Sequence, residues 1–328
     1  MKIIESKAEL LLQPDGLEGV YKQIELCGRT CYKSTDKITE DSAKPFVDRM
    51  IASKHTAMLE QGTVYLKIPY NLLHRLTHIG LCKKYVNNPY SRVQEFYEYI
   101  DHPIPNGDDL TCNIIPYLAV TTNLRVIVEN GWLDDLEYIC EPTDYHEKRY
   151  TIRFTTDRGV SHELVRHRVF SFAQESTRYC NYSKEKFGNE LTFIIPAWAN
   201  NRDEISYAHD PHNLDERDML KEDFGASYGG FLHQLCLIED EYLWQLQQGR
   251  TPQEARQILP NALKTEVCMT GFASDWKFFF DLRFYGMTGK PHPDMEVLAS
   301  KAREEFIKAG KWDEIYSSPS KFREEMDK

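Results

Sequence analysis

The sequence predicts an α+β fold in which a central, largely antiparallel sheet is flanked by helices. Two stretches, residues 63–68 and 149–155, alternate polar and apolar side chains as strands do. Apolar residues with helical spacing predict helices elsewhere, most clearly over residues 231–246. Neither a GxGxxG motif nor a Walker loop is present, which disfavours a Rossmann-type domain.

Further elements are predicted from hydrophobic spacing and from residues that start or stop helices. The predicted helices cover residues 41–60, 70–86, 123–130 and 270–284, and a last helix follows a loop over 286–293. Pro69 closes the first strand, a turn-rich loop covers 100–109, and a strand covers 191–195. Thr251 and Pro252 start a further helix, and Glu254 completes its capping box.

Ser161 is expected to cap the helix that follows the strand at 149–155. Glu163 would lie in the first turn of that helix, where a carboxylate suits the helix dipole. Arg166, His167 and Arg168 would then lie about 100° apart around the helix axis. They cannot all face one core, so at least one is expected to point at solvent or at a ligand.

The chain has 328 residues, 41% of them hydrophobic, and a formal net charge of −11. An acidic protein is a poor non-specific ligand for nucleic acid, because that affinity comes mainly from neutralising phosphates. We therefore expect no nucleic-acid partner. The aromatic content of 12% suits pockets that stack planar rings.

The eight cysteines form no CxxC pair, so we expect reduced, mostly buried thiols and no metal site. The first residues lack the hydrophobic region of a signal peptide, and no run of about 18 apolar residues occurs. We expect a cytoplasmic protein that does not associate with membranes.

Positive charge is concentrated in residues 166–179 of this acidic chain, which include Arg166, His167, Arg168 and Arg178. The planar guanidinium fork binds phosphate or carboxylate with two hydrogen bonds. Because such a cluster repels itself unless an anion lies among its members, it predicts a site for a phosphorylated ligand. The alternative is a solvated charged helix face, which is common for runs of charge.

Arg166-His167-Arg168, followed after seven residues by Ser176, resembles the signature of the flavin-dependent thymidylate synthases. Other segments resemble further motifs of that family in the same order. They are residues 29–34, 55–61, 255–260 and 281–283. In all, the resemblance covers residues 20–70 and 150–310.

This resemblance implies that the chain methylates dUMP to dTMP with the one-carbon unit of methylenetetrahydrofolate. It implies FAD as a bound cofactor and NADPH as the reductant of that FAD. Subunits of the family form homotetramers with sites between subunits, and we expect the same assembly here.

The resemblance also implies roles for individual residues. The expected dUMP-binding residues are Glu163, Arg166, Gln174, Ser176, Arg178, Arg256 and Arg283. The expected FAD-binding residues are Arg166, His167, Arg168, Gln174 and His292, and His55 is expected near the folate and the flavin. Arg283 is the expected catalytic residue, because a fixed cation beside uracil N3 favours the ionised ring and makes carbon 5 a better nucleophile.

A covalent role for Ser176 is the alternative to a binding role. The sequence shows no Ser-His-Asp pattern that would activate this hydroxyl, so binding is favoured. The Pro-Cys-His tripeptide of the other thymidylate synthase family is absent, and Cys180 is therefore not expected to be a nucleophile.

Several positions depart from the family pattern. Phe272 and Ser274 stand where the family commonly has Asn-x-Arg, and Phe278 replaces a further asparagine on the flavin side. Residues 70–148 look like an insertion into an otherwise single domain over residues 1–328. The insertion contains Asn123-Leu124-Arg125, which either supplies substitute flavin or dUMP contacts or is a coincidental tripeptide on a helix.

These departures motivate a second hypothesis, a nucleotide- and flavin-binding homologue without synthase turnover. A third hypothesis, a nucleic-acid binder that uses the arginine-rich segment, is disfavoured by the overall acidity.

Overall fold

The protein is described by a computed structural model that covers residues 1–70, 80, 83–99, 114–185, 188–199, 201–210 and 212–317. Most of the helix predicted over residues 70–86, and all of the loop predicted over residues 100–109, lie outside the described residues.

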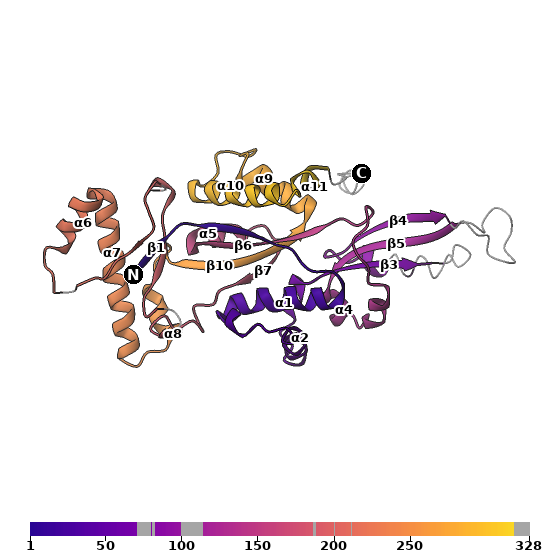
Figure 1. The fold of residues 1–328 in the computed structure, drawn as a ribbon, viewed down its shortest axis with the longest axis horizontal. Coiled ribbons are helices and arrows are strands. Elements are labelled where there is room, and N and C mark those ends of the chain that lie inside the picture. Colours follow the sequence, from indigo (N-terminus) through magenta and orange to yellow (C-terminus); the bar gives the residue numbers. More distant parts are fainter. Residues whose placement is uncertain are drawn as a thin grey trace.

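A four-stranded antiparallel sheet runs through the middle of the molecule (Figure 1). In spatial order its strands are β2 (Lys7–Leu11), β6 (Arg149–Asp157), β10 (Lys264–Phe272) and β7 (Ser171–Gln174). All three neighbouring pairs are antiparallel. The predicted fold class, α+β with a largely antiparallel central sheet, is confirmed.

Two smaller sheets extend the molecule. An antiparallel sheet at one end contains β3 (Thr63–Pro69), β5 (Ile114–Asn123) and β4 (Arg92–Tyr99), in that order. The other sheet contains β8 (Thr192–Ile194), β1 (Lys2–Ile4) and β9 (Ile205–Ser206), and its β1–β8 pair is parallel. The strands predicted over residues 63–68 and 191–195 are thus confirmed.

Helices cover both faces of the central sheet (Figure 1). One face carries α1 (Gly16–Tyr32) and α2 (Ala43–Ala52), and the other carries α9 (Ala273–Arg283), α10 (Pro293–Lys308) and α11 (Trp312–Ser317). The remaining helical segments are α4 (Leu124–Glu129), α5 (Arg158–Leu164), α6 (Glu216–Phe224), α7 (Ala226–Gln247), α8 (Pro252–Ala255), and the 3-10 turns η1 (Thr35–Lys37), η2 (Thr56–Gln61), η3 (Leu133–Tyr138), η5 (Ala197–Ala199) and η6 (Arg256–Ile258).

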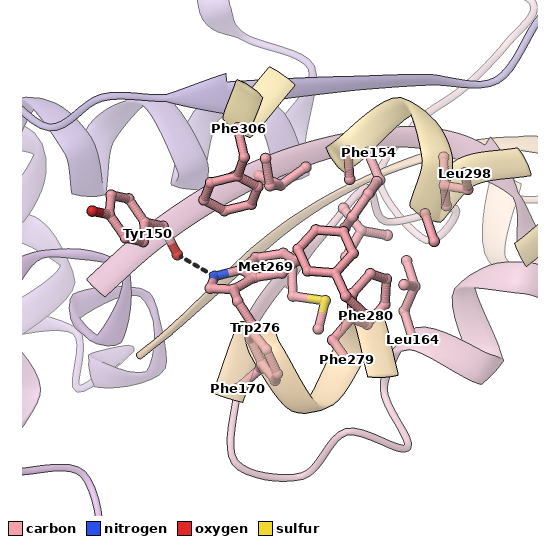
Figure 2. Close-up of a cluster of buried hydrophobic side chains, with 14 of the residues drawn as sticks. Tyr150, Phe154, Leu164, Phe170, Met269, Trp276, Phe279, Phe280, Leu298 and Phe306 are labelled. Carbon is pink, nitrogen blue, oxygen red and sulfur yellow. Dashed lines mark hydrogen bonds between the residues drawn. The ribbon is translucent and has the colours of Figure 1, made fainter. Parts of the chain in front are cut away.

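The largest aromatic cluster of the core lies between the central sheet and the α9–α10 layer. Trp276 is fully buried there, and its indole N–H donates a hydrogen bond of 3.1 Å to the backbone carbonyl of Tyr150 (Figure 2). Phe279, Phe280 and Phe306 pack around the indole ring. Helix α9 is therefore fixed to the sheet by close packing, and its last residue, Arg283, is held in a defined place.

The sequence predictions need correction at three places here. Instead of one helix over residues 41–60, α2 ends at Ala52 and the separate 3-10 turn η2 covers Thr56–Gln61. Strand β10 was not predicted, and the helix expected over residues 270–284 begins only at Ala273. The six residues from Val267 to Phe272 are all buried, so the strand has no polar alternation. The capping box of Thr251 and Glu254 is confirmed, because the Glu254 carboxylate accepts hydrogen bonds from the backbone N–H and hydroxyl of Thr251.

Candidate functional site

Helix α5 begins four residues earlier than expected. Its cap is Asp157, whose carboxylate accepts a 2.8 Å hydrogen bond from the Val160 N–H, and Ser161 lies inside the helix. The prediction that Ser161 is the cap is therefore wrong. The helix ends at Leu164, so residues 166–168 lie in the turn before β7, not around a helix axis. This turn can direct neighbouring side chains to different partners.

Arg283 brings the end of α9 into contact with α5 and with this turn. Its Nε donates a 3.0 Å hydrogen bond to His167 Nε2, and its Nη2 lies 3.3 Å from Glu163 Oε2. Glu163 also lies 3.1 Å from Arg166, whose side chain is 71% exposed. Four residues predicted to act together, Glu163, Arg166, His167 and Arg283, are therefore in direct contact. We call them the Arg283 cluster.

His167 is the buried member of this cluster. Burial, and secondly the charge of Arg283, lower the pKa of His167 to about 4. Since Nε2 accepts a hydrogen bond from Arg283, the neutral ring carries its own proton on Nδ1. The ring packs edge-on against Phe279, with the ring centroids 5.2 Å apart. At neutral pH His167 is thus an uncharged acceptor that orients the guanidinium.

We expect acid to destabilise the fold between about pH 6.5 and pH 4 through its buried neutral histidines. His146, buried like His167, has a pKa lowered to about 4, mainly by burial. The unfolded chain binds protons in this range that the folded chain does not, so stability falls as the pH falls. Each histidine should cost about 2 kcal/mol at pH 5 relative to pH 7.

Urea unfolding at pH 7 and at pH 5 measures this loss. His146 lies outside the Arg283 cluster and hydrogen-bonds the Leu66 carbonyl and the Thr143 N–H. His146→Gln should reduce the stability difference between the two pH values. An unchanged difference in this variant would contradict the assignment.

Of the other predicted dUMP residues, three lie at and after the end of β7, and Arg256 lies in the 3-10 turn η6. Gln174 donates a 2.9 Å hydrogen bond to the Ser161 hydroxyl of α5, which ties this region to the helix that carries Glu163. The Ser176 N–H donates to the Cys31 carbonyl at 3.1 Å. Arg256 donates to the Thr177 hydroxyl at 3.2 Å, and Arg178 is exposed beside it in the chain. Gln174, Ser176, Arg178 and Arg256 thus form a second group, which we call the β7 group.

His292 and Glu163 line the same cavity, which has a volume of about 310 Å³. His292 is 55% exposed and lies 3.5 Å from the Asp294 carboxylate. Arg168 is exposed in the turn before β7. His55 is exposed just before η2, a turn that packs on α1, α2 and α4 and also contacts β7 and β10. Among the described residues, neither His55 nor Arg168 forms a hydrogen bond or ion pair with the Arg283 cluster.

The positions that depart from the family pattern have structural roles of their own. Phe272 is buried beneath the guanidinium groups of Arg92 and Arg149, at 4.3 and 5.4 Å from its ring centroid. The Ser274 N–H donates to the Glu147 carboxylate at 3.1 Å. By contrast, Phe278 is 43% exposed, and its ring lies 6.4 Å from that of His167. Of the three, only Phe278 offers an accessible surface beside the Arg283 cluster.

The Asn123-Leu124-Arg125 tripeptide lies where β5 ends and α4 begins. Asn123 caps the helix by accepting from the Val126 N–H, and Arg125 forms ion pairs with Glu60 and Glu129. Glu60 belongs to the segment over residues 55–61 that carries one of the motifs. The tripeptide therefore lies against that segment, but its arginine is already engaged by two carboxylates.

Sequence reasoning missed four charged residues beside the β7 group: Lys33, Glu175, Lys264 and Glu266. They form a buried network of ion pairs. The available signal was Glu175, a carboxylate between two predicted ligands, Gln174 and Ser176. The partners of Glu175 are distant from it in sequence, so no local sequence pattern predicts these ion pairs.

Over the part of the chain that the structure describes, no group of three or more His, Cys, Asp or Glu side chains could hold a metal ion. Within those same residues, no helix is both long and apolar enough to cross a bilayer. The six described cysteines form no disulfide with one another, and five of them are buried.

The model of the family described as "Thymidylate synthase complementing protein" matches residues 146–309, which is half of the chain. The flavin-dependent thymidylate synthase of Corynebacterium efficiens is 31% identical over 142 residues, covering 43% of this chain and 50% of the relative. That of Mycobacterium tuberculosis H37Rv is 28% identical over 144 residues, covering 43% and 49%. The chain thus matches only about half the length of these curated relatives.

Solved structures resemble the fold loosely. The UMP/dUMP methylase PolB from Streptomyces cacaoi, bound with 5-Br dUMP, has a TM-score of 0.42 at 13% identity and covers 96% of each chain. Thymidylate synthase X from Helicobacter pylori, with FAD and dUMP, has a TM-score of 0.35 at 18% identity and covers 50% of this chain and 70% of that one.

Proposed function

Because this chain belongs to the family of thymidylate synthase complementing proteins, we propose that it converts dUMP to dTMP by reductive methylation. The one-carbon unit would come from methylenetetrahydrofolate, and NADPH would reduce a bound FAD. The observation that carries the proposal is the placement of the Arg283 guanidinium between His167 and Glu163.

Arg283 would act on the pyrimidine as a fixed cation. Its side chain is only 18% exposed, and two partners hold its direction. A cation beside uracil N3 lowers the pKa of that N–H, and the ionised ring carries more electron density at carbon 5. Because His167 is neutral, it orients the guanidinium without competing for the negative charge that develops on the ring.

The β7 group would bind the nucleotide. Arg178 and Arg256 are exposed cations suited to a phosphate: Arg178 follows Thr177 in the chain, and Arg256 donates to the Thr177 hydroxyl. Gln174 and Ser176 would orient the ring and the sugar with neutral hydrogen bonds. Within the described part of the chain, Ser176 forms no hydrogen bond with a histidine, which supports a binding role over a covalent one.

The surroundings of His167 fit an FAD. Arg166 and Arg168, its neighbours in the chain, are exposed cations suited to a pyrophosphate, and the half-exposed Phe278 offers an aromatic surface. His292 would approach from the cavity shared with Glu163. When bound, FAD would supply the reducing equivalents that convert the transferred methylene group to a methyl group. We propose a homotetramer, because the resemblance to the family implies sites between subunits.

Tritium release from dUMP labelled at carbon 5 tests the proposal. The complete mixture contains FAD, NADPH and methylenetetrahydrofolate, and each is omitted in turn. Release that needs all three supports the synthase, and no release in the complete mixture rejects it. The second candidate, a binding homologue without turnover, is favoured by the burial of Phe272 and predicts a flavin that NADPH does not bleach.

Residues 70–148 are proposed to be an insertion whose Asn123-Leu124-Arg125 tripeptide assists flavin or dUMP binding. If so, Arg125→Ala should lower flavin occupancy and weaken dUMP binding several-fold, measured by absorbance and calorimetry. Lys67→Ala, which breaks the Lys67–Glu98 ion pair of the same small sheet, is the control. Unchanged occupancy and affinity in Arg125→Ala would leave the tripeptide a purely structural cap.

A further inference from the structure

We propose that Lys33, Glu175, Lys264 and Glu266 form a charge quartet that positions the nucleotide-binding residues on either side of Glu175. The inference deepens the proposed function and rests on it, since Gln174 and Ser176 are the residues being positioned. The quartet members would touch neither dUMP nor flavin and would act through their neighbours.

The quartet is largely buried, although Lys33 and Glu266 are 23% and 19% exposed and line a cavity. Lys264 Nζ lies 2.9 Å from Glu175 Oε2 and 2.7 Å from Glu266 Oε1. Lys33 Nζ contacts Glu266 and lies 3.6 Å from Glu175 Oε2. The Glu175 side chain is only 1% exposed, and Lys264 is 12% exposed. Two cations and two anions balance, and loss of one would leave a buried charge without full compensation.

The ionised state of the quartet follows from the same contacts. Burial by itself would raise the pKa of Glu266, but Lys264 and Lys33 together lower it to about 2. The Lys264 pKa is raised in spite of burial, because Glu175 and Glu266 face it. Lys264 and Glu266 therefore stay charged across the neutral range, whereas burial lowers the pKa of Lys33.

These four side chains join three elements that are distant in sequence. Lys33 is the residue with φ of 47° that ends α1, Lys264 and Glu266 lie on β10, and Glu175 follows β7. Backbone hydrogen bonds join the same elements. The Glu175 N–H donates to the Glu266 carbonyl at 2.8 Å, and the Ser176 N–H donates to the Cys31 carbonyl. Tyr182 donates to Glu175 Oε1 at 3.1 Å from the far side. The segment after β7 is thus attached to α1, to β10 and to Tyr182, which lies further along the same segment.

Because side chains alternate along a strand, the ion pairs of Glu175 also set the direction of the neighbouring Gln174 side chain. Successive side chains point to opposite faces, so Glu175 faces the end of α1 while Gln174 faces Ser161 of α5. A shift of the β7 register by one residue would exchange the directions of the Gln174 and Glu175 side chains. Gln174 would then leave the face that carries Glu163 and Arg283. A buried, fully paired carboxylate fixes this register because no other side chain of the segment could satisfy Lys33 and Lys264.

The test compares two lysine-to-methionine variants with matched exposure. Lys33→Met removes a quartet member that is 23% exposed, and Lys84→Met removes a lysine that is 20% exposed and pairs with Asp135 near the small β3–β5–β4 sheet. Calorimetric titration with dUMP should show about tenfold weaker binding for Lys33→Met and less than about a twofold change for Lys84→Met. Lys33→Arg, which keeps the charge, should restore binding.

Hydrogen exchange supplies a readout that does not need a nucleotide. The Ser176 N–H donates to the Cys31 carbonyl, and the Cys180 N–H donates to the Ser176 carbonyl. Both amide hydrogens should exchange with solvent at least about tenfold faster in Lys33→Met but not in Lys84→Met. Equal exchange in the two variants, or unchanged dUMP affinity in Lys33→Met, overturns the positioning role. If the unaltered protein binds no dUMP, the proposed function fails, and the exchange result alone then decides whether the quartet holds the segment.

Discussion

Replacing Arg283 with alanine is expected to lower kcat/KM for dTMP formation by about 10²–10³-fold, the loss typical of removing one preorganised electrostatic contact. The variant would take away the cation beside the pyrimidine and leave His167 Nε2 without its donor. Glu163 would keep its contact with Arg166, so the fold of α5 should persist. Tritium release under saturating folate and NADPH measures the effect.

Lys277→Ala is the matched control for this experiment. Lys277 lies on the same helix, is 42% exposed and pairs with Asp281, so its loss should leave turnover within about twofold. Arg283→Lys should be nearly as inactive as alanine, because an ammonium cannot reach His167 and Glu163 with two fixed donors. Turnover above about one tenth of the original rate in Arg283→Ala would exclude the proposed role of this cation.

The largest expected loss of stability comes from Trp276→Ala. Trp276 is fully buried, contacts Phe279 and Phe306, and donates to the Tyr150 carbonyl (Figure 2). Removing a core tryptophan costs about 3–5 kcal/mol, because burial is lost and a cavity remains. We expect a lower urea midpoint, measured at fixed protein concentration so that assembly does not confound the comparison.

Trp276→Phe separates packing from the hydrogen bond, since it keeps an aromatic ring and leaves the Tyr150 carbonyl without this donor. We expect about 1–3 kcal/mol of destabilisation from that change. Trp244→Ala, at a site that is 50% exposed, should cost much less. Equal losses in Trp276→Ala and Trp244→Ala would show that the α9–α10 layer contributes little to the stability of the sheet.

Local sequence signals predicted some of the elements but missed others that have one exposed face, such as β2 and β4. The strand over residues 149–155 alternates and was found, and the capping box of Thr251 and Glu254 marked a true helix start. Strand β10 was missed because it is covered on both faces and includes Gly271, which lies against the Phe170 ring. Neither condition leaves a periodic pattern in the sequence.

The candidate site was predictable as a set of residues but not as a geometry. Arg283 and His167 are 116 positions apart, and only the packing of α9 on the sheet brings them to 3.0 Å. The position of α5 was wrong because Asp157 and Ser161 both have capping side chains, and local sequence does not decide between them. The quartet around Glu175 could not be predicted from local sequence, because its side chains come from three segments that are distant in the chain.

The first strands of the chain have a consequence for biosynthesis. Strand β1 pairs with β8 through Lys2 and Thr192, and β2 pairs with β6 through Ala8 and Phe154. A nascent chain emerging from the ribosome must therefore keep β1 and β2 unpaired until their partners, 190 and 146 residues further along the chain, have been translated. Such long-range closure slows folding and exposes strand edges to other chains, so we expect early translation products to depend on chaperones.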